Sequence, residues 1–244
     1  MSADTLQPHL PWIESHLPLP PVENAWGEDT EAPGLLAAGS DLGVERLLEA
    51  YAKGVFPWFN ADQPVLWWSP DPRMVLVPSE LRVSRSLRKR LRSGAFRVSY
   101  DEAPAQVIDA CAGPRDGSDG TWITAEIRQA YLDLHARGHM HTVEAWAGEE
   151  LAGGLYGVSI GRMFYGESMF TRRTDGSKVA LAWLARQLGR WGFSLIDCQA
   201  QTDHLASLGA REMPRAEFQR QLAACIAEPP PPLWRFDPGL AETF

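Results

Sequence analysis

The chain has 244 residues, of which 45% are hydrophobic, so it can bury a sizeable core in one large domain or two small ones. No stretch approaches the roughly 18 uncharged apolar residues of a membrane span, and the N-terminal region lacks the basic start and apolar core of a secretion signal, which argues against an embedded or secreted protein. The formal net charge of -8 argues against a nucleic-acid partner unless basic residues are concentrated in one place.

The first part of the chain is expected to form a small N-terminal domain, residues 1–72. Residues 1–33 are rich in proline and lack periodicity, so we expect an extended arm with one short strand. Apolar residues recur at helical spacing over 41–54, with an aspartate that can cap the helix and a glycine that can end it. Residues 55–73 place three tryptophans among four prolines, which prevents a long regular element and predicts a rigid aromatic loop.

The remainder, residues 73–244, alternates helical and strand patterns. Helices are expected at 84–94, 104–113, 123–138, 177–192 and 216–227, and strands at 74–78, 96–101 and 193–199, with a run of short strands and glycine turns over 141–170. Ser177 is the expected N-cap of its helix. This alternation predicts an α/β (α+β) fold with a mixed, antiparallel-rich sheet.

A cluster of positive charge interrupts the acidic sequence. Residues 82–97 hold seven basic residues and no acidic one. In a helix, Arg85, Arg88, Lys89 and Arg92 share one face with Arg90 close by, and their mutual repulsion costs stability unless a polyanion binds there. A phosphate-binding face and an ordinary solvated face both fit this segment.

Two tryptophans lie in segments bounded by glycine and proline, where a side chain can be presented to a cleft. Trp58 lies in FPWF and Trp122 in GTWIT. Unpaired bases are held mainly by stacking on aromatic rings, worth about 1–3 kcal/mol per base. The alternative, that both indoles belong to the core, stays open at this point.

Acidic and amide groups interrupt two otherwise apolar strands. In LIDCQ, the strand period of two sends Asp197 and Gln199 to one side, and Glu167 stands beside Gly166 in FYGESMF. Such groups are costly in a core unless they are paired, so we expect them to line a cleft. Each could instead be a structural hydrogen-bond anchor.

Other chemical signals are weak. His139 and His141 form an HxH without a suitably placed third ligand, and the cysteines Cys111, Cys198 and Cys225 are too widely spaced for a paired metal site. Their number favours a reducing cytoplasm over a disulfide framework. No phosphate-binding, dinucleotide-binding or GxSxG motif is present, so no metal and no cofactor are expected.

Seven segments in colinear order, from about residue 20 to Phe236, together resemble the bacterial leucyl/phenylalanyl-tRNA–protein transferase family. They are GLLAAGSDLGVERLLEAYAKGVFPWF, LWWSPDPRMVL, SRSLRKRLR, GTWIT, GLYGVSIGRMFYGESMF, SKVAL and IDCQAQTDHLASLGA. The sequence departs from the family pattern at Ser40, where glycine is expected, and at Thr202, where asparagine is common. Neither residue is assigned a role.

The resemblance implies an N-terminal domain joined to a catalytic domain of the GNAT acyltransferase fold. It implies that Trp58 and Trp122 sandwich the terminal adenosine of a tRNA. The apolar pocket for the leucyl or phenylalanyl side chain, with methionine as a third candidate, would involve Leu155, Phe164, Met169, Leu184 and Ile196. The basic helix would hold the acceptor stem.

The resemblance also implies that the acceptor is a protein beginning with Arg or Lys, placed near Glu167, Asp197 and Gln199, and that the product is marked for degradation. An aminoacyl ester is already activated, so the expected chemistry is alignment of the attacking amine, with Asp197 orienting Gln199. Two alternatives remain. Acetyl-CoA use is disfavoured because the turn TRRTDGSK lacks a glycine-rich phosphate loop, and a tRNA-binding module without activity would not need the acidic groups.

Overall fold

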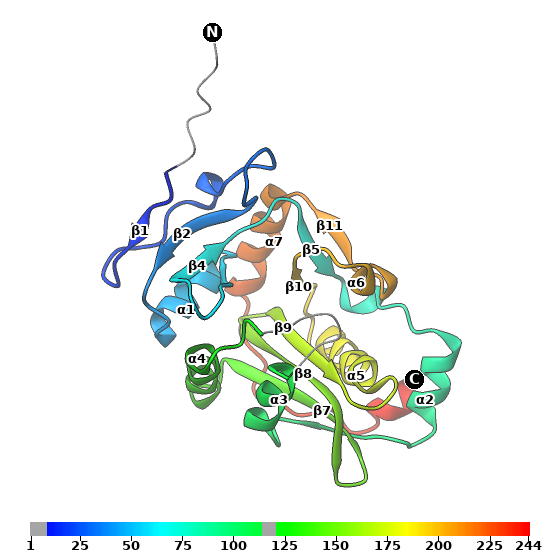
Figure 1. Cartoon of the computed structure of the whole chain (residues 1–244). Coiled ribbons are helices and arrows are strands. Elements are labelled where there is room, and N and C mark those ends of the chain that lie inside the picture. Colours follow the sequence, from blue (N-terminus) through cyan, green and yellow to red (C-terminus); the bar gives the residue numbers. More distant parts are fainter. Residues whose placement is uncertain (1–8, 114–120) are drawn as a thin grey trace.

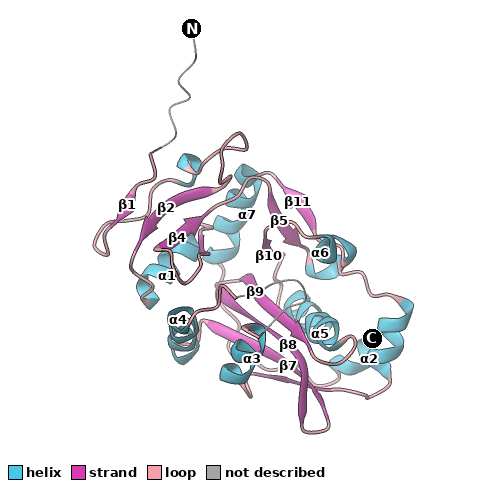
Figure 2. Ribbon diagram, viewed as in Figure 1, coloured by secondary structure: helices cyan, strands magenta, loops and turns pink. Residues whose placement is uncertain are grey.

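The computed structural model describes residues 9–113 and 121–244. Two sheets with flanking helices form the molecule, as the ribbon colours of Figure 2 make plain. Part of the expected N-terminal arm, residues 1–8, lies outside the described residues. In the described ranges no helix has the length and apolar character that crossing a membrane requires.

The N-terminal part forms a four-stranded sheet in the order β1-β2-β4-β3. Its strands are β1 (Trp12–Ile13), β2 (Leu35–Gly39), β3 (Phe56–Pro57) and β4 (Val65–Trp68). The expected aromatic loop is therefore partly wrong, because β3 and β4 pair antiparallel and place Pro57 opposite Trp67. The prolines keep these strands short, and β2 was missed because five small or apolar residues carry no alternating pattern.

Helix α1 (Val44–Ala52) connects β2 to β3 and buries Leu47, Ala50 and Tyr51. It ends at Ala52, and the chain turns at Gly54, whose φ of +69° suits glycine. Asp41 accepts a hydrogen bond from the Gly43 amide at 2.8 Å, so it orders the turn before the helix.

The second sheet has seven strands in the order β11-β5-β10-β9-β8-β7-β6 (Figure 1). They are β5 (Arg73–Leu76), β6 (Arg97–Tyr100), β7 (Met140–Ala147), β8 (Glu150–Ile160), β9 (Met163–Thr171), β10 (Leu195–Gln199) and β11 (Arg211–Met213). All neighbouring pairs are antiparallel except β9 and β10. The expectation of a mixed, antiparallel-rich sheet is thus confirmed, whereas the expected run of short strands is wrong: β7 to β9 are 8, 11 and 9 residues long.

Six helices accompany this sheet: α2 (Arg85–Arg92), α3 (Pro104–Cys111), α4 (Ala125–Ala136), α5 (Gly176–Arg190), α6 (Asp203–Ser207) and α7 (Arg215–Ala227). Ser177 is not the cap of α5, which begins one residue earlier; Asp175 with φ +70° holds that position. Ser177 accepts a hydrogen bond from Thr171 instead, at 2.6 Å. The chain changes from the first sheet to the second between Trp68 and Arg73. The division into domains 1–72 and 73–244 stays a prediction.

The two faces of the large sheet bury separate clusters. One face packs Leu76, Val143 and Ile196 against Leu181 and Leu184 of α5. The opposite face carries a larger cluster that continues through α3, α4 and α1 into the N-terminal sheet. Because α5 is the crossover between the parallel strands β9 and β10, it also defines one side of the site described next.

Candidate active site

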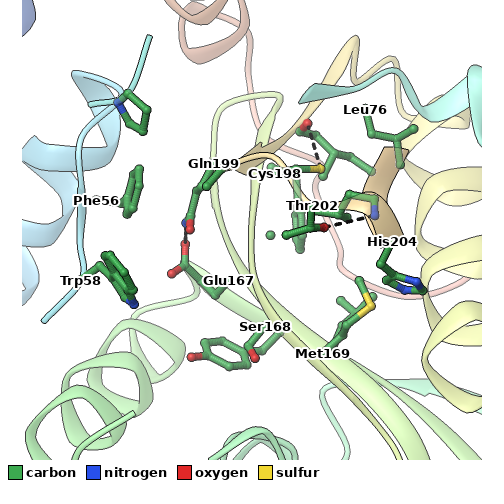
Figure 3. Close-up of a pocket in the computed structure, with 18 of the residues that line it drawn as sticks. Phe56, Trp58, Leu76, Glu167, Ser168, Met169, Cys198, Gln199, Thr202 and His204 are labelled. Atoms are coloured by element: carbon green, nitrogen blue, oxygen red, sulfur yellow. Dashed lines mark hydrogen bonds between the residues drawn. The ribbon is translucent and has the colours of Figure 1, made fainter. Parts of the chain in front are cut away.

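A cavity of about 670 Å³ opens where β9 and β10 separate. These strands pair only from Met163–Leu195 to Tyr165–Asp197, after which β9 continues to Thr171 paired with β8 but not with β10. Where the two strands separate, their facing edges are no longer paired, and residues of both β9 and β10 line the gap. The N-terminal sheet covers the other side with Phe56 and Trp58 (Figure 3).

One end of the cavity is apolar. It contains all five residues that the family resemblance assigned to an aminoacyl pocket: Leu155, Phe164, Met169, Leu184 and Ile196. Leu76 and Leu181, which the sequence did not single out, complete the wall. Leu76 was missed because it lies between two valines, and no adjacent polar residue indicated a site. An enclosure of this composition suits an aliphatic or aromatic side chain.

Both candidate stacking indoles line the same cavity. Trp58 is 51% exposed, and its ring meets Trp68 edge-on at 5.5 Å between centroids. Trp68 in turn donates its indole N–H to the Trp58 carbonyl at 2.7 Å, which fixes the short hairpin that presents Trp58. Trp122 is half-buried just before α4. Neither indole is sealed in the core, so each leaves part of its ring accessible to a ligand in the cavity.

Glu167 lies at the centre of the cavity and is held by two hydrogen bonds. The strand register skips it, pairing Tyr156 with Ser168 and Gly157 with Gly166, so Glu167 occupies a bulge that turns its side chain into the gap. Its carboxylate accepts from the Tyr131 hydroxyl at 2.7 Å and from the Gln199 amide nitrogen at 2.8 Å. Burial raises the pKa of Glu167 to about 7, against the lowering effect of the tyrosine hydrogen bonds.

Two tyrosines that the sequence did not single out belong to this network. Tyr131 of α4 contacts Tyr51 of α1 through their hydroxyl groups at 2.5 Å, and Tyr165 donates to the Tyr51 carbonyl at 2.7 Å. Burial raises the pKa of Tyr51 and Tyr131 well above the ordinary value, with the Glu167 charge adding to it. Both tyrosines looked like ordinary core residues of amphipathic helices, so no local signal identified them.

Gln199 lines the cavity, whereas Asp197 does not. Asp197 is fully buried and forms a two-point ion pair with Arg73, with distances of 2.8 and 2.6 Å. The expectation that Asp197 lines the cleft is therefore wrong. The bulge between Asp197 and Gln199 breaks the simple alternation of sides on which that expectation rested.

Asp197 nevertheless contacts Gln199 directly. It accepts a hydrogen bond from the Gln199 backbone amide at 2.9 Å. Gln199 has a φ of +64°, a conformation that glutamine adopts only when its surroundings hold it. Arg73 lies between the rings of Phe56 and Phe218, at 4.7 and 4.9 Å. This buried assembly thus fixes the direction of the Gln199 side chain.

The five candidate phosphate-binding cations lie on α2, outside the cavity. Ser84 caps the helix, Leu87 is buried, and Arg85, Arg88, Lys89, Arg90 and Arg92 are all exposed. Leu87 packs with Val179 and Trp183 of α5. Since Leu181 and Leu184 of the same helix line the cavity, α5 lies between α2 and the cavity.

The residues with weak metal or nucleophile signals have structural partners. His141 lies 2.8 Å from Asp101, and burial raises the pKa of the Cys198 thiol far above its ordinary value. Within residues 9–113 and 121–244, no group of three His, Cys, Asp or Glu side chains could hold a metal ion. His204 lines the far end of the cavity near Met169 and was not anticipated (Figure 3).

Comparisons with known proteins identify the family of this chain. The family profile described as "Leucyl/phenylalanyl-tRNA protein transferase" matches residues 75–223, and the profile of that family's N-terminal domain matches residues 40–71. Leucyl/phenylalanyl-tRNA–protein transferases of Cupriavidus necator and Aromatoleum aromaticum are 55% and 57% identical to this chain. The matched region covers 96% and 91% of this chain, and 95% and 93% of the lengths of these two relatives.

Solved structures show more distant similarity. A GCN5-related N-acetyltransferase from Kribbella flavida has a TM-score of 0.35 and 11% identity, covering 69% of this chain and 59% of its own. The structure of L-PGS from Bacillus licheniformis has a TM-score of 0.37 and 11% identity, with coverage of 84% and 69%. On the sequence matches, the chain belongs to the leucyl/phenylalanyl-tRNA–protein transferase family of aminoacyltransferases.

Proposed function

We propose that this protein transfers leucine or phenylalanine, with methionine as a third donor, from aminoacyl-tRNA to the α-amine of proteins that begin with Arg or Lys. The new N-terminal residue marks the acceptor for N-degron proteolysis. The supporting observation is one cavity that joins an apolar end, two accessible indoles and the Glu167–Gln199 pair. The reaction belongs to the cytoplasm, where charged tRNA is made.

The donor is positioned by three features. Trp58 and Trp122 stack against the terminal adenosine, which orients the ester toward the apolar end of the cavity. The leucyl or phenylalanyl side chain fills that end. Cations of α2 contact the phosphates of the acceptor stem, because α2 packs directly on α5, the helix that forms one wall of the cavity, and exposes five cations beside it.

The acceptor enters beside Glu167. Its cationic side chain is attracted by the ionised carboxylate, which selects Arg or Lys through charge complementarity. Asp197 supplies no comparable attraction, since Arg73 neutralises it. Selection of the acceptor side chain therefore depends on Glu167.

The chemical step needs alignment more than activation, because an ester is already reactive toward an amine. The Gln199 amide nitrogen donates to Glu167, which directs the amide oxygen away from it and leaves that oxygen free to accept a hydrogen bond from the attacking amine. An α-amine has a pKa of about 8, so a useful fraction is neutral at cellular pH. The amine attacks the ester carbonyl, a peptide bond forms, and the tRNA ribose hydroxyl leaves with the proton.

Incubation with radiolabelled leucyl-tRNA and a peptide beginning with Arg tests the proposal. We expect label in the peptide, and none in an otherwise identical peptide beginning with Gly. Gln199→Ala should bind leucyl-tRNA as the unchanged protein does but transfer at least tenfold more slowly. Transfer to both peptides alike would contradict the acceptor assignment, and tRNA binding without any transfer would indicate a binding module.

A further inference from the structure

The last part of the chain forms a strap, residues 229–244, that leaves α7, passes the sheet and ends beside α2 (Figure 1). It is fastened at three places. Pro229 accepts from Arg162 at 3.3 Å, the Asp237 amide donates to the Gln187 side chain at 2.7 Å, and the Phe244 carbonyl accepts from Arg92 at 2.6 Å. The matching family profile ends at residue 223, so the strap lies outside it.

Trp234 is a half-buried residue of the strap that packs against the apolar cluster beside α5. Its ring stacks on His141 with 3.7 Å between centroids and an interplanar angle of 11°. It also meets Trp191 at 5.1 Å and Phe193 at 6.1 Å. These rings contact the indole on several sides, and the remainder of the side chain is half-buried.

One further ring connects Trp234 to the active site. The Phe164 ring lies 6.2 Å from it, tilted by 38°, and Phe164 is also part of the apolar wall of the cavity. Trp234 packs against the same cluster that holds Leu155, Leu184 and Ile196. The strap therefore supports the pocket wall from outside the cavity.

Phe164 is also confined by the neighbouring strand. A Cβ atom at Gly157 would lie 2.5 Å from the Phe164 ring, so glycine is needed there for the ring to occupy its place. The ring therefore lies against the Gly157 backbone on one side and near Trp234 on another. Truncation of Trp234 would leave the ring free to move on that side.

We propose that Trp234 is a positioning residue that determines donor specificity: by holding the Phe164 ring in place, it limits the size of the side chain that the aminoacyl pocket accepts. The inference rests on the proposed function, since it assumes that the apolar end of the cavity receives the donor side chain. Truncation of Trp234 leaves a void into which Phe164 can move, and the pocket then deepens.

The test uses one tRNA, charged in separate reactions by a ribozyme with leucine, phenylalanine or tryptophan, and a peptide beginning with Arg. A single tRNA body removes differences in acceptor-stem recognition. For Trp234→Ala we expect kcat/KM for the tryptophanyl donor, relative to the leucyl donor, to rise about tenfold over the unchanged protein. Trp234→Leu should give a smaller rise in the same direction, because leucine refills part of the void.

Two matched controls separate this effect from loss of stability. Phe236→Ala removes a ring that packs on Tyr100 at 4.0 Å and on Trp183 at 4.9 Å, so it loosens the same strap elsewhere. Leu233→Ala changes the neighbouring residue, which is 55% exposed. Both should keep the donor ratio within twofold, although Phe236→Ala lowers the melting temperature.

Each outcome has a distinct meaning. An unchanged donor ratio in both Trp234 variants would overturn the inference, as would a rise in Phe236→Ala equal to that in Trp234→Ala. If Trp234→Ala does not fold, the ratio in Trp234→Leu decides in the same way. Absence of transfer from the leucyl donor by the unchanged protein would instead refute the proposed function.

Discussion

Glu167 combines two requirements that oppose each other. Burial favours its protonated form and raises its pKa to about 7, yet Tyr131 and Gln199 both donate to it as they would to a carboxylate. The folded-state pKa is above the ordinary value of 4.5, so the folded protein binds the proton more tightly than the unfolded chain does. Stability from this group is therefore present below pH 4.5 and is lost as the pH rises to about 7.

Glu167→Gln should consequently stabilise the protein at alkaline pH. We expect its free energy of unfolding to exceed that of the unchanged protein by about 1–3 kcal/mol at pH 8, because glutamine has no charge to bury. At pH 4 the two proteins should differ little. Urea titrations at both pH values measure this, and an equal difference at pH 4 and pH 8 would rule out the ionisation as its cause.

The same substitution should change the pH profile of transfer. In the unchanged protein, kcat/KM for an Arg peptide should rise as Glu167 ionises near pH 7 and again as the α-amine loses its proton near pH 8. Glu167→Gln should retain only the step near pH 8. Its lower preference for an Arg peptide over a neutral one would show that the charge also selects the acceptor. A step near pH 7 that survives the substitution belongs to another group.

Asp197 and Arg73 combine a structural and a positioning role. Asp197→Ala should lower the free energy of unfolding by about 3–5 kcal/mol, since it leaves the buried guanidinium without its partner. The double variant Arg73→Met with Asp197→Leu should recover most of that stability. It should not recover transfer, because the carboxylate that accepts the hydrogen bond from the Gln199 backbone amide is still missing. Recovery of both stability and transfer in the double variant would show that Asp197 has only a structural role.

At the scale of the elements, the helices could be predicted from sequence because their signals are local. Ser84 and Thr124 cap α2 and α4 through their hydroxyl groups, and apolar residues at helical spacing mark the buried faces. The order of the strands could not be predicted in this way. The gap between β9 and β10 depends on which strands become neighbours across α5, and residue spacing within a strand does not encode that.

The same difference between local and long-range signals separates the site residues that were placed correctly from those that were not. Side chains on regular stretches, such as Leu155 and Phe164, were found in the cavity, whereas Asp197 was placed on the wrong side because a bulge follows it. Arg73 was missed because its partner lies 124 residues away in the sequence. The family resemblance supplied the pocket residues, and their assigned roles stay predictions until variants are measured.

The contact between α5 and β8 makes a further prediction at this scale. A Cβ atom at Gly153 would lie 2.4 Å from the Gly176 backbone, at the first residue of α5. Gly153→Ala should push the helix away from the sheet, lower the melting temperature and weaken transfer, since α5 carries Leu181 and Leu184 of the cavity wall. Gly189→Ala in the same helix meets only Pro78 at 3.9 Å and should stabilise by up to about 1 kcal/mol.

At the scale of the whole molecule, the charges are unevenly distributed. The net charge of -8 would repel a tRNA at long range, yet five exposed cations project from α2 alone. Arg92 is also engaged by the carbonyl of Phe244, so the strap contributes to holding this helix in place. Binding of a polyanion should thus depend on a small surface and be sensitive to salt.

Neutralising that surface should change the salt dependence of tRNA binding in a countable way. For Arg85→Gln with Arg88→Gln, we expect weaker leucyl-tRNA binding and a slope of log K against log salt that is shallower by about 0.7–0.9 for each lost phosphate contact. The matched control, Arg211→Gln with Arg220→Gln, removes equal charge from exposed positions on β11 and α7 and should leave the slope unchanged. Equal slopes for the two pairs would mean that α2 attracts tRNA only through overall charge. A steeper slope for the control pair, together with recovery of transfer by the α2 pair at low salt, would establish direct phosphate contacts. Loss of such contacts weakens tRNA binding but leaves the cavity intact, because no residue of α2 lines it.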